Sequence, residues 1–208
     1  MSNTIRKPCG EGVHFGTTVG AALRPTGLLA TLALAALTAP PARAATYDVG
    51  PGQPLAAVGD VPWESLAPGD EVRIHWRAEP YREKLVVAVQ ATEAQPVVIR
   101  GIPNESGELP VLDGQSATTR AALNFWNENR SVIKIGGSNT PDCDQPDCVP
   151  SWITLESLDV RSARPPYSFT SSRGGGSYAD NAAAIHIEVG RNITIRSCRI
   201  HDSGNGLF

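Results

Sequence analysis

Three aspartates lie close together near the middle of the chain, on a segment that also carries two cysteines. They are Asp142, Asp144 and Asp147, in PDCDQPDC (141–148). Three carboxylates on one loop can converge as hard oxygen ligands, which is the coordination that Ca²⁺ prefers. The segment lacks the glycine and the ligand spacing of an EF-hand loop, so a structural loop with solvated acids is the alternative. Ca²⁺ is therefore the one cofactor hypothesis that the sequence supports.

A second group of chemically capable side chains lies on stretches that alternate apolar and polar residues. In IHIE (185–188), the period of a strand points the two isoleucines one way and His186 and Glu188 the other. Lys134 holds the position of His186 in the matching stretch VIKIG (132–136). We expect Lys134, His186 and Glu188 to form one exposed row. The alternative is that they are ordinary solvated side chains, since charged residues are mostly exposed.

Trp126 is the aromatic residue that could contact a sugar. In the segment NFWNE (124–128) it is either a stacking platform for a saccharide ring or a side chain buried under the neighbouring chain. Trp126 and Glu188 are therefore candidates for substrate binding. A glycoside hydrolase would need two or three carboxylates on adjacent segments, whereas Glu188 and Asp202 are isolated candidates.

Short strands must position these residues, because the chain repeats itself. WITLESLDVRS (152–162) matches NITIRSCRIHD (192–202) at six of eleven positions, forty residues apart. VIKIG matches AIHIE (184–188), and GLF (206–208) begins the same pattern 22 residues after Ala184. Units of about 22 residues with strand–turn–strand chemistry and no helical periodicity predict an all-β fold, with successive strands stacked in parallel as a solenoid. A leucine-rich horseshoe is disfavoured because its leucine ladder is absent.

The segments before this repeat fit the same frame. Strands are expected over 71–76, 85–89 and 96–100, and a short helix within 52–66 could plug the open end of the solenoid. Two polar stretches rich in Pro, Gly and Ser, 137–150 and 163–181, are expected as loop insertions on the surface.

The segment NITIRSCRIHDSGNGLF (192–208) resembles the coil pattern of right-handed parallel β-helix proteins of the pectin lyase-like superfamily, which are secreted polysaccharide lyases and hydrolases. LAPGDEVRIHW, YREKLVV, PVVIRG and PVLDG are similar to the first, capping coils of that family. The resemblance covers residue 47 to the end. It implies a right-handed parallel β-helix with an N-terminal cap, and a chain that is the N-terminal fragment of a longer solenoid, truncated at its C-terminus.

The resemblance also implies a function. In the resembled enzymes the outer face of one parallel sheet forms a saccharide groove, where a basic residue abstracts the sugar C5 proton and Ca²⁺ or Arg stabilises the uronate carboxylate. Lys134, His186, Arg196 and Arg199 are the candidates for such a role. We expect a polysaccharide lyase that cleaves an acidic, uronate-containing polysaccharide by β-elimination, and the alternative is a non-catalytic surface or adhesion solenoid that binds saccharides.

The beginning of the chain has the features of an export signal. An uncharged apolar run (26–38) follows basic residues and precedes ARA (42–44), a small-x-small cleavage pattern. The run is too short for a comfortable membrane span. We therefore predict a signal peptide over residues 1–44, cleavage after Ala44, export to the periplasm or the outside, and one β-helix domain over 45–208 without a membrane partner.

Charge and cysteine usage agree with this prediction. The first 44 residues hold four of the 18 basic and one of the 21 acidic residues, so the remaining chain carries a net charge of −6. Nucleic acid is thereby disfavoured as a partner, because no basic stripe could neutralise its phosphates. In an exported chain we expect Cys143 and Cys148 to form a disulfide bond, and Cys198 to serve as a small inward-facing apolar residue.

Overall fold

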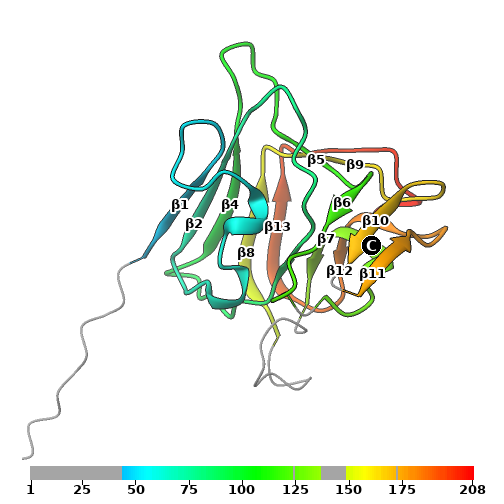
Figure 1. Cartoon of the computed structure of the whole chain (residues 1–208). Helices are drawn as coiled ribbons and strands as arrows, with labels where there is room; N and C mark the ends of the chain where they lie inside the picture. Colours follow the sequence, from blue (N-terminus) through cyan, green and yellow to red (C-terminus); the bar gives the residue numbers. More distant parts are fainter. Residues whose placement is uncertain (1–43, 124, 137–148, 172) are drawn as a thin grey trace, which may run out of the picture. The chain divides into compact units, whose positions relative to one another are not determined.

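The computed structural model describes residues 44–123, 125–136, 149–171 and 173–208. The predicted signal peptide up to residue 43, the cysteine pair Cys143 and Cys148, and the calcium candidates Asp142, Asp144 and Asp147 lie outside these residues. Within the described residues the fold is all-β, as the repeat predicts, and the strands form four sheets (Figure 1). No helix of the described part is long and apolar enough to span a membrane.

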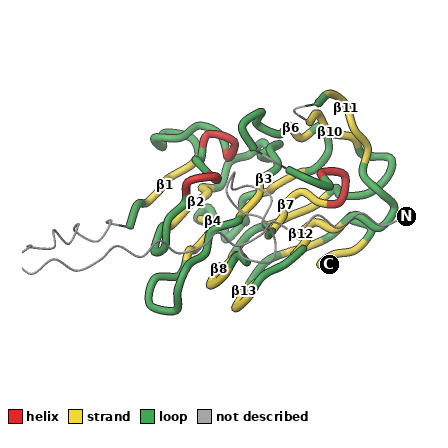
Figure 2. Tube along the Cα trace, turned by 90° about the horizontal axis from the view of Figure 1, so that it is seen from below, coloured by secondary structure: helices red, strands yellow, loops and turns green. Residues whose placement is uncertain are grey.

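The first sheet contains five strands, and all of its pairs are parallel. In sheet order they are β1 (Thr46–Val49), β2 (Glu71–His75), β4 (Val97–Ile102), β8 (Ser151–Glu156) and β13 (Arg191–Arg196). The sheet order follows the order in the chain, so each later strand is added beside the preceding one, as Figure 2 shows.

The second and third sheets are also parallel throughout. The second sheet consists of β15 (Asn205–Leu207), β12 (Ala183–Ile187), β7 (Ser131–Ile135) and β3 (Leu85–Val87). The third sheet consists of β14 (Arg199–Ile200), β9 (Asp159–Arg161) and β5 (Val111–Asp113). Successive passes of the chain therefore supply one strand after another to the same sheets.

The register that the repeat predicts is confirmed in detail. β8 and β13 pair with Ile153 opposite Ile193, and β7 and β12 pair with Lys134 opposite His186. The final strand continues the pattern, because Ile185 on β12 lies opposite Leu207 on β15.

The turns repeat together with the strands. Three pairs of non-glycine residues, each forty positions apart, share a left-handed backbone with φ between 51° and 62°: Trp152 and Asn192, Ser157 and Ser197, and Ser162 and Asp202. Side chains with a Cβ adopt this conformation at an energetic cost, so its recurrence at matched positions reflects a geometry that the stacked strands impose.

The core runs between the sheets and is built by alternation along each strand. Ile99 and Leu155 on the first sheet, Ile133 and Ile185 on the second and Val160 on the third are completely buried in one hydrophobic cluster. Burying such a side chain contributes roughly 1.5–3 kcal/mol relative to leaving it exposed. Cys198 packs against this cluster, in agreement with its predicted inward orientation, and burial raises the pKa of its thiol.

Two short 3₁₀ helices occupy the segment in which a plugging helix was expected. They are η1 (Val58–Asp60) and η2 (Trp63–Ser65), and their flanking apolar residues are buried in the core. The indole of Trp63 donates a hydrogen bond of 2.8 Å to the carbonyl of Val58, which fixes one helix against the other.

The stretch 163–181, expected as a surface loop, contains a β-hairpin. Its strands are β10 (Ser168–Ser171) and β11 (Gly174–Ser177), and β10 also pairs in parallel with β6 (Ala117–Thr118) to form the fourth sheet. Phe169 and Tyr178 of this stretch are buried, with ring centroids 4.9 Å apart. The many glycines and serines suggested a loop, yet Phe169 and Tyr178 pack into the core cluster and anchor the hairpin.

Candidate functional site

The outer face of the second sheet brings together most of the predicted site residues. Lys134 and His186 are direct neighbours on the paired strands β7 and β12, and Glu188 follows β12 on the same side. The isoleucines between them point into the core, so the predicted alternation holds. The Nζ of Lys134 lies 2.9 Å from Oε2 of Glu188.

The expectation that this row is exposed is wrong. Lys134 is completely buried and His186 is 6% exposed, whereas the Glu188 side chain is 24% exposed. The segment that precedes β7 covers the row, and the carbonyl oxygen of Trp126 accepts a hydrogen bond of 2.9 Å from Lys134 Nζ. This segment has no counterpart in the repeat, so the alternation alone could not reveal the cover.

Gly136, directly after β7, makes the ion pair of Lys134 and Glu188 sterically possible. A Cβ atom at this position would come within 2.8 Å of both Glu188 Oε2 and Lys134 Cε. Any larger residue would have to push the carboxylate or the lysine stem aside. Gly136 therefore belongs to the site, although its residue type alone gave no signal.

Burial changes the acid–base properties of both cations. Desolvation lowers the pKa of Lys134, while its hydrogen bond and charge interaction with Glu188 work in the opposite direction. Desolvation also lowers the pKa of His186, assisted by the positive charges of Lys134 and Arg130 and opposed by Glu188. A neutral imidazole is consequently favoured at neutral pH, and it can accept a proton.

The His186 ring has an aromatic neighbour and an unused nitrogen. Its centroid lies 5.2 Å from that of Phe208, and the Arg130 guanidinium lies 5.5 Å from the Phe208 ring. Nδ1 of His186 has no hydrogen-bond partner among the described residues. A buried nitrogen without a partner costs free energy, and such groups in native structures often serve a function.

Trp126 is 58% exposed, so the alternative of a buried tryptophan does not apply. Its ring lies 5.5 Å from Lys134 Nζ. It lines a cavity of about 450 Å³ together with Phe125, Phe169 and Arg173. An exposed indole beside other aromatic side chains and a guanidinium can stack on a sugar ring.

Lys84 lies close to the same cavity and was not predicted as a site residue. It is completely buried, and its Nζ lies 3.6 Å from the ring centre of Phe169, 4.6 Å from that of Tyr178 and 5.1 Å from that of Phe125. Nζ also donates a hydrogen bond of 2.5 Å to the carbonyl of Glu128. Burial lowers the pKa of Lys84 to about 7, with the charge of Glu128 opposing the change. The alternation of side chains along β3, extended back to residue 84, would have placed Lys84 on the outer face of the sheet. The aromatic rings that surround it come from segments far away in the sequence, so spacing could not predict them.

The two arginine candidates lie on other sheets. Arg196 on β13 shares the carboxylate of Glu156 with Arg100, in register across the first sheet. Burial alone would raise the pKa of Glu156, but hydrogen bonds from Arg196 and Arg100 outweigh it and hold this pKa below its usual value. Arg196 is therefore part of an ion-pair ladder away from the Lys134 row.

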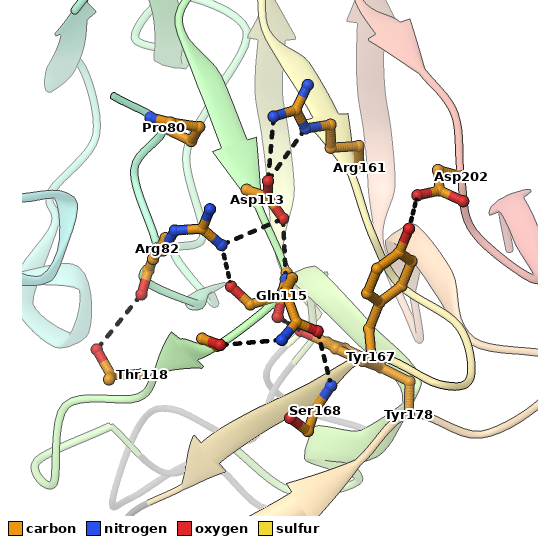
Figure 3. Close-up of polar contacts among 12 residues, drawn as sticks. Pro80, Arg82, Asp113, Gln115, Thr118, Arg161, Tyr167, Ser168, Tyr178 and Asp202 are labelled. Carbon is orange, nitrogen blue, oxygen red and sulfur yellow. Dashed lines mark hydrogen bonds and ion pairs between the residues drawn. The ribbon is translucent and has the colours of Figure 1, made fainter. Parts of the chain in front are cut away.

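Arg199 belongs to the outer face of the third sheet. Its Nη1 lies 3.3 Å from Oδ2 of Asp159, whose other oxygen lies 2.9 Å from Nε2 of His201. The next carboxylate on this face, Asp113, is contacted by Arg161 from one side and Arg82 from the other, as Figure 3 shows. Figure 3 also shows the hydroxyl of Tyr167 pointing to Asp202.

No group of three or more His, Cys, Asp or Glu side chains in the described part of the chain is arranged to hold a metal ion. The Ca²⁺ hypothesis concerns aspartates outside that part and stays a prediction. No protein-family model, no curated protein and no solved structure matches this chain.

Proposed function

We propose that this protein is an exported right-handed parallel β-helix that cleaves an acidic, uronate-containing polysaccharide as a lyase. The β-helix is supported by the parallel sheets and by the 22-residue step from Ala183 to its partner Asn205. A coil of this length without crossover helices has to stack its strands on neighbouring coils. The resemblance of 192–208 to pectin lyase-like coils supports the same architecture.

The observation that carries the catalytic part is the pairing of Lys134 with His186. Both side chains have a lowered pKa, they are neighbours on adjacent strands, and the exposed Trp126 lies beside Lys134. A base with a pKa near or below neutrality can take up a proton at physiological pH, and an adjacent ammonium can stabilise the negative charge that develops.

In this proposal His186 removes the proton at C5 of the uronate. The electron pair of that C–H bond forms the C4–C5 double bond, and the glycosidic bond at C4 breaks, with the departing oxygen taking a proton from water. Lys134, the cross-strand neighbour of His186, has the role of stabilising the enolate-like intermediate with its charge. The substrate has to displace the cover near Trp126 before it reaches either side chain.

Export is a further part of the proposal. It is supported by the apolar run 26–38, the basic residues that precede it and the ARA pattern at 42–44. The exported protein then begins at Ala45, and the cysteine pair Cys143 and Cys148 is in a compartment where a disulfide bond persists.

A second candidate function is a non-catalytic saccharide-binding solenoid. It is favoured by the complete burial of Lys134, whose Nζ already has Trp126 and Glu188 as partners. In that case Trp126 and the cavity beside it bind sugar, and the lysine and histidine stabilise the fold beneath.

The test separates these two functions. The purified chain is incubated with polygalacturonate, alginate and hyaluronan, and the ultraviolet absorbance of unsaturated uronate is followed together with new reducing ends. We expect absorbance to rise with one of them and His186→Ala to slow this rise by at least about 100-fold. The matched control is His75→Ala, because His75 pairs with Asp48 on the first sheet.

Reducing ends without ultraviolet absorbance would identify a hydrolase and overturn the lyase. Saccharide binding without either product would establish the non-catalytic solenoid. An unchanged rate in His186→Ala would remove His186 from the mechanism.

A further inference from the structure

A cleft of about 620 Å³ lies where the chain turns from the first sheet to the third. Its walls come from the segment after β2, which includes Trp76 and Arg77, and from the segment that leads into β5. This second segment extends beyond the strands that it joins (Figure 1). The floor is the outer face of the third sheet, with Asp159, Arg161 and Arg199. We call the site formed by Trp76, Arg77, Arg161 and Arg199 the arginine cleft.

The hydrogen bonds of Arg77 go to uncharged groups, although the carboxylate of Glu83 is near enough to interact with its charge. Nε of Arg77 donates a hydrogen bond of 2.9 Å to the carbonyl of Glu79, and its Nη2 donates one of 3.1 Å to the carbonyl of Pro80. The guanidinium lies 3.7 Å from the centre of the Tyr81 ring. These contacts use two of the five N–H groups of an arginine, and they fix its plane.

Arg161 and Arg199 are held from below by carboxylates. Nε and Nη2 of Arg161 each lie 3.1 Å from Oδ2 of Asp113, as Figure 3 shows, and Arg199 contacts Asp159. Both aspartate side chains are almost buried, whereas the Arg199 side chain is 70% exposed. The carboxylates therefore orient the guanidinium groups without covering their outer edges.

The lining of the cleft holds more positive than negative side chains. Three guanidinium groups line it against the carboxylates of Asp159 and Glu108, while Asp113, which holds Arg161 from below, is almost buried beneath the lining. Asp159 is already engaged by Arg199 and His201. The chain after residue 44 carries a net charge of −6. A local cationic site on an acidic protein attracts an anion.

The shape of the donors narrows the type of anion. A guanidinium group binds a carboxylate through two parallel hydrogen bonds, and the cleft adds the ring of Trp76, a surface on which a sugar can pack. A small inorganic anion would use the arginines and leave Trp76 without a contact. The arrangement fits a sugar that carries a carboxylate.

We propose that the arginine cleft binds a uronate residue of an acidic oligosaccharide, at a subsite distinct from the row of Lys134 and His186. The choice of ligand rests on the proposed function, whereas the location of the site rests on the cleft itself. A polysaccharide held there is anchored on a different sheet from the one that carries the proposed catalytic pair.

The test measures binding of uronate oligosaccharides by calorimetry. Oligogalacturonate, oligomannuronate and hyaluronan fragments are titrated into the full chain, with neutral malto-oligosaccharides and sodium sulfate as comparison ligands. We expect Arg199→Gln and Arg77→Gln each to weaken uronate binding about tenfold, since a hydrogen bond to a charged group contributes about 1.5 kcal/mol or more.

The matched control is Arg196→Gln. Arg196 is exposed to a similar degree, 62% of its side chain, and it also pairs with a buried carboxylate, but it lies on the first sheet. Binding in this variant should equal that of the unchanged protein.

Three results would overturn the inference. They are binding that is unaffected by both cleft variants, equal weakening by Arg196→Gln, and sulfate or neutral sugars binding as tightly as uronates. The outcome is independent of catalysis, because His186→Ala is expected to slow cleavage and to leave binding in the cleft unchanged.

Discussion

Two faces of this protein pair a cation with a carboxylate, and they bury opposite members of the pair. On the second sheet, Lys134 is completely buried and Glu188 reaches the surface. On the third sheet, Asp159 is almost buried, with 6% of its side chain exposed, and Arg199 reaches the surface. The second sheet thus has its positive charge inside and its negative charge outside, and the third sheet has the reverse.

The difference has a chemical consequence. Desolvation lowers the pKa of His186 beside Lys134, so the second sheet holds a neutral imidazole that can accept a proton, whereas an arginine stays charged at any pH that a protein tolerates. The second sheet is therefore suited to proton transfer, and the third sheet to the binding of anions.

The largest effect is expected from removing the partner of the buried lysine. Glu188→Gln keeps the shape of the side chain but removes the negative charge that lies 2.9 Å from the buried ammonium of Lys134. We expect the free energy of unfolding to fall by about 3 kcal/mol, as for other buried ion pairs that lose one member. Urea denaturation at pH 7 measures this loss.

Lys134→Met in the same background completes the measurement. Methionine keeps most of the aliphatic stem without the charge, so the double variant should recover most of the stability that Glu188→Gln loses. If the losses in the free energy of unfolding are simply additive in the double-mutant cycle, the two side chains do not stabilise each other. The contrast drawn between the second and the third sheet would then be wrong.

Lys84 provides the next test, because its cation is buried among aromatic rings. With a pKa lowered to about 7, the folded protein releases this proton at a pH where the unfolded chain, with the ordinary lysine value of 10.5, still holds it. The free energy of unfolding therefore gains a contribution that rises from pH 7 upward, by at most about 1.4 kcal/mol per pH unit.

The contribution is measured as the difference between the unchanged protein and Lys84→Met in urea denaturation at pH 7, 8 and 9. We expect this difference to change in favour of the unchanged protein as pH rises. The same experiment with Lys134→Met should give a smaller slope, because Glu188 holds the charged form of Lys134. Parallel stability curves for Lys84→Met and the unchanged protein would contradict the lowered pKa.

Much of the fold was predictable because strand alternation and repeat spacing are local properties of the sequence. The pairing of Ile153 with Ile193, and of Lys134 with His186, followed from spacing alone. Spacing could not predict that other segments cover the outer face of the second sheet. The segment around Trp126 and the hairpin that carries Phe169 interrupt the repeat, and their positions depend on packing between distant segments.

The candidate site was likewise predictable in part. Lys134, His186 and Glu188 were predicted as one row, and they form one, but their burial reverses the expected environment and with it the chemistry. Of the residues that form the arginine cleft, only Arg199 was predicted from the sequence as a site residue. Trp76 and Arg77 belong to a turn that has no partner in the repeat. Residue types identify candidates, and the non-repeating segments decide which of them are exposed.

The smallest effect is expected on the third sheet, and it bears most directly on the comparison. Arg199→Gln removes an exposed cation, and Asp159 keeps its hydrogen bond to His201. We therefore expect the free energy of unfolding to fall by at most about 1 kcal/mol, the usual range for exposed ion pairs, and Arg196→Gln to behave alike. Urea denaturation of both variants beside Glu188→Gln measures the contrast. A loss of about 3 kcal/mol in Arg199→Gln would mean that the buried aspartate depends on its arginine as strongly as the buried lysine depends on Glu188. The ion pair of Arg199 and Asp159 would then stabilise the fold. Weakened uronate binding in Arg199→Gln could in that case result from the lost stability and could no longer be assigned to the cleft.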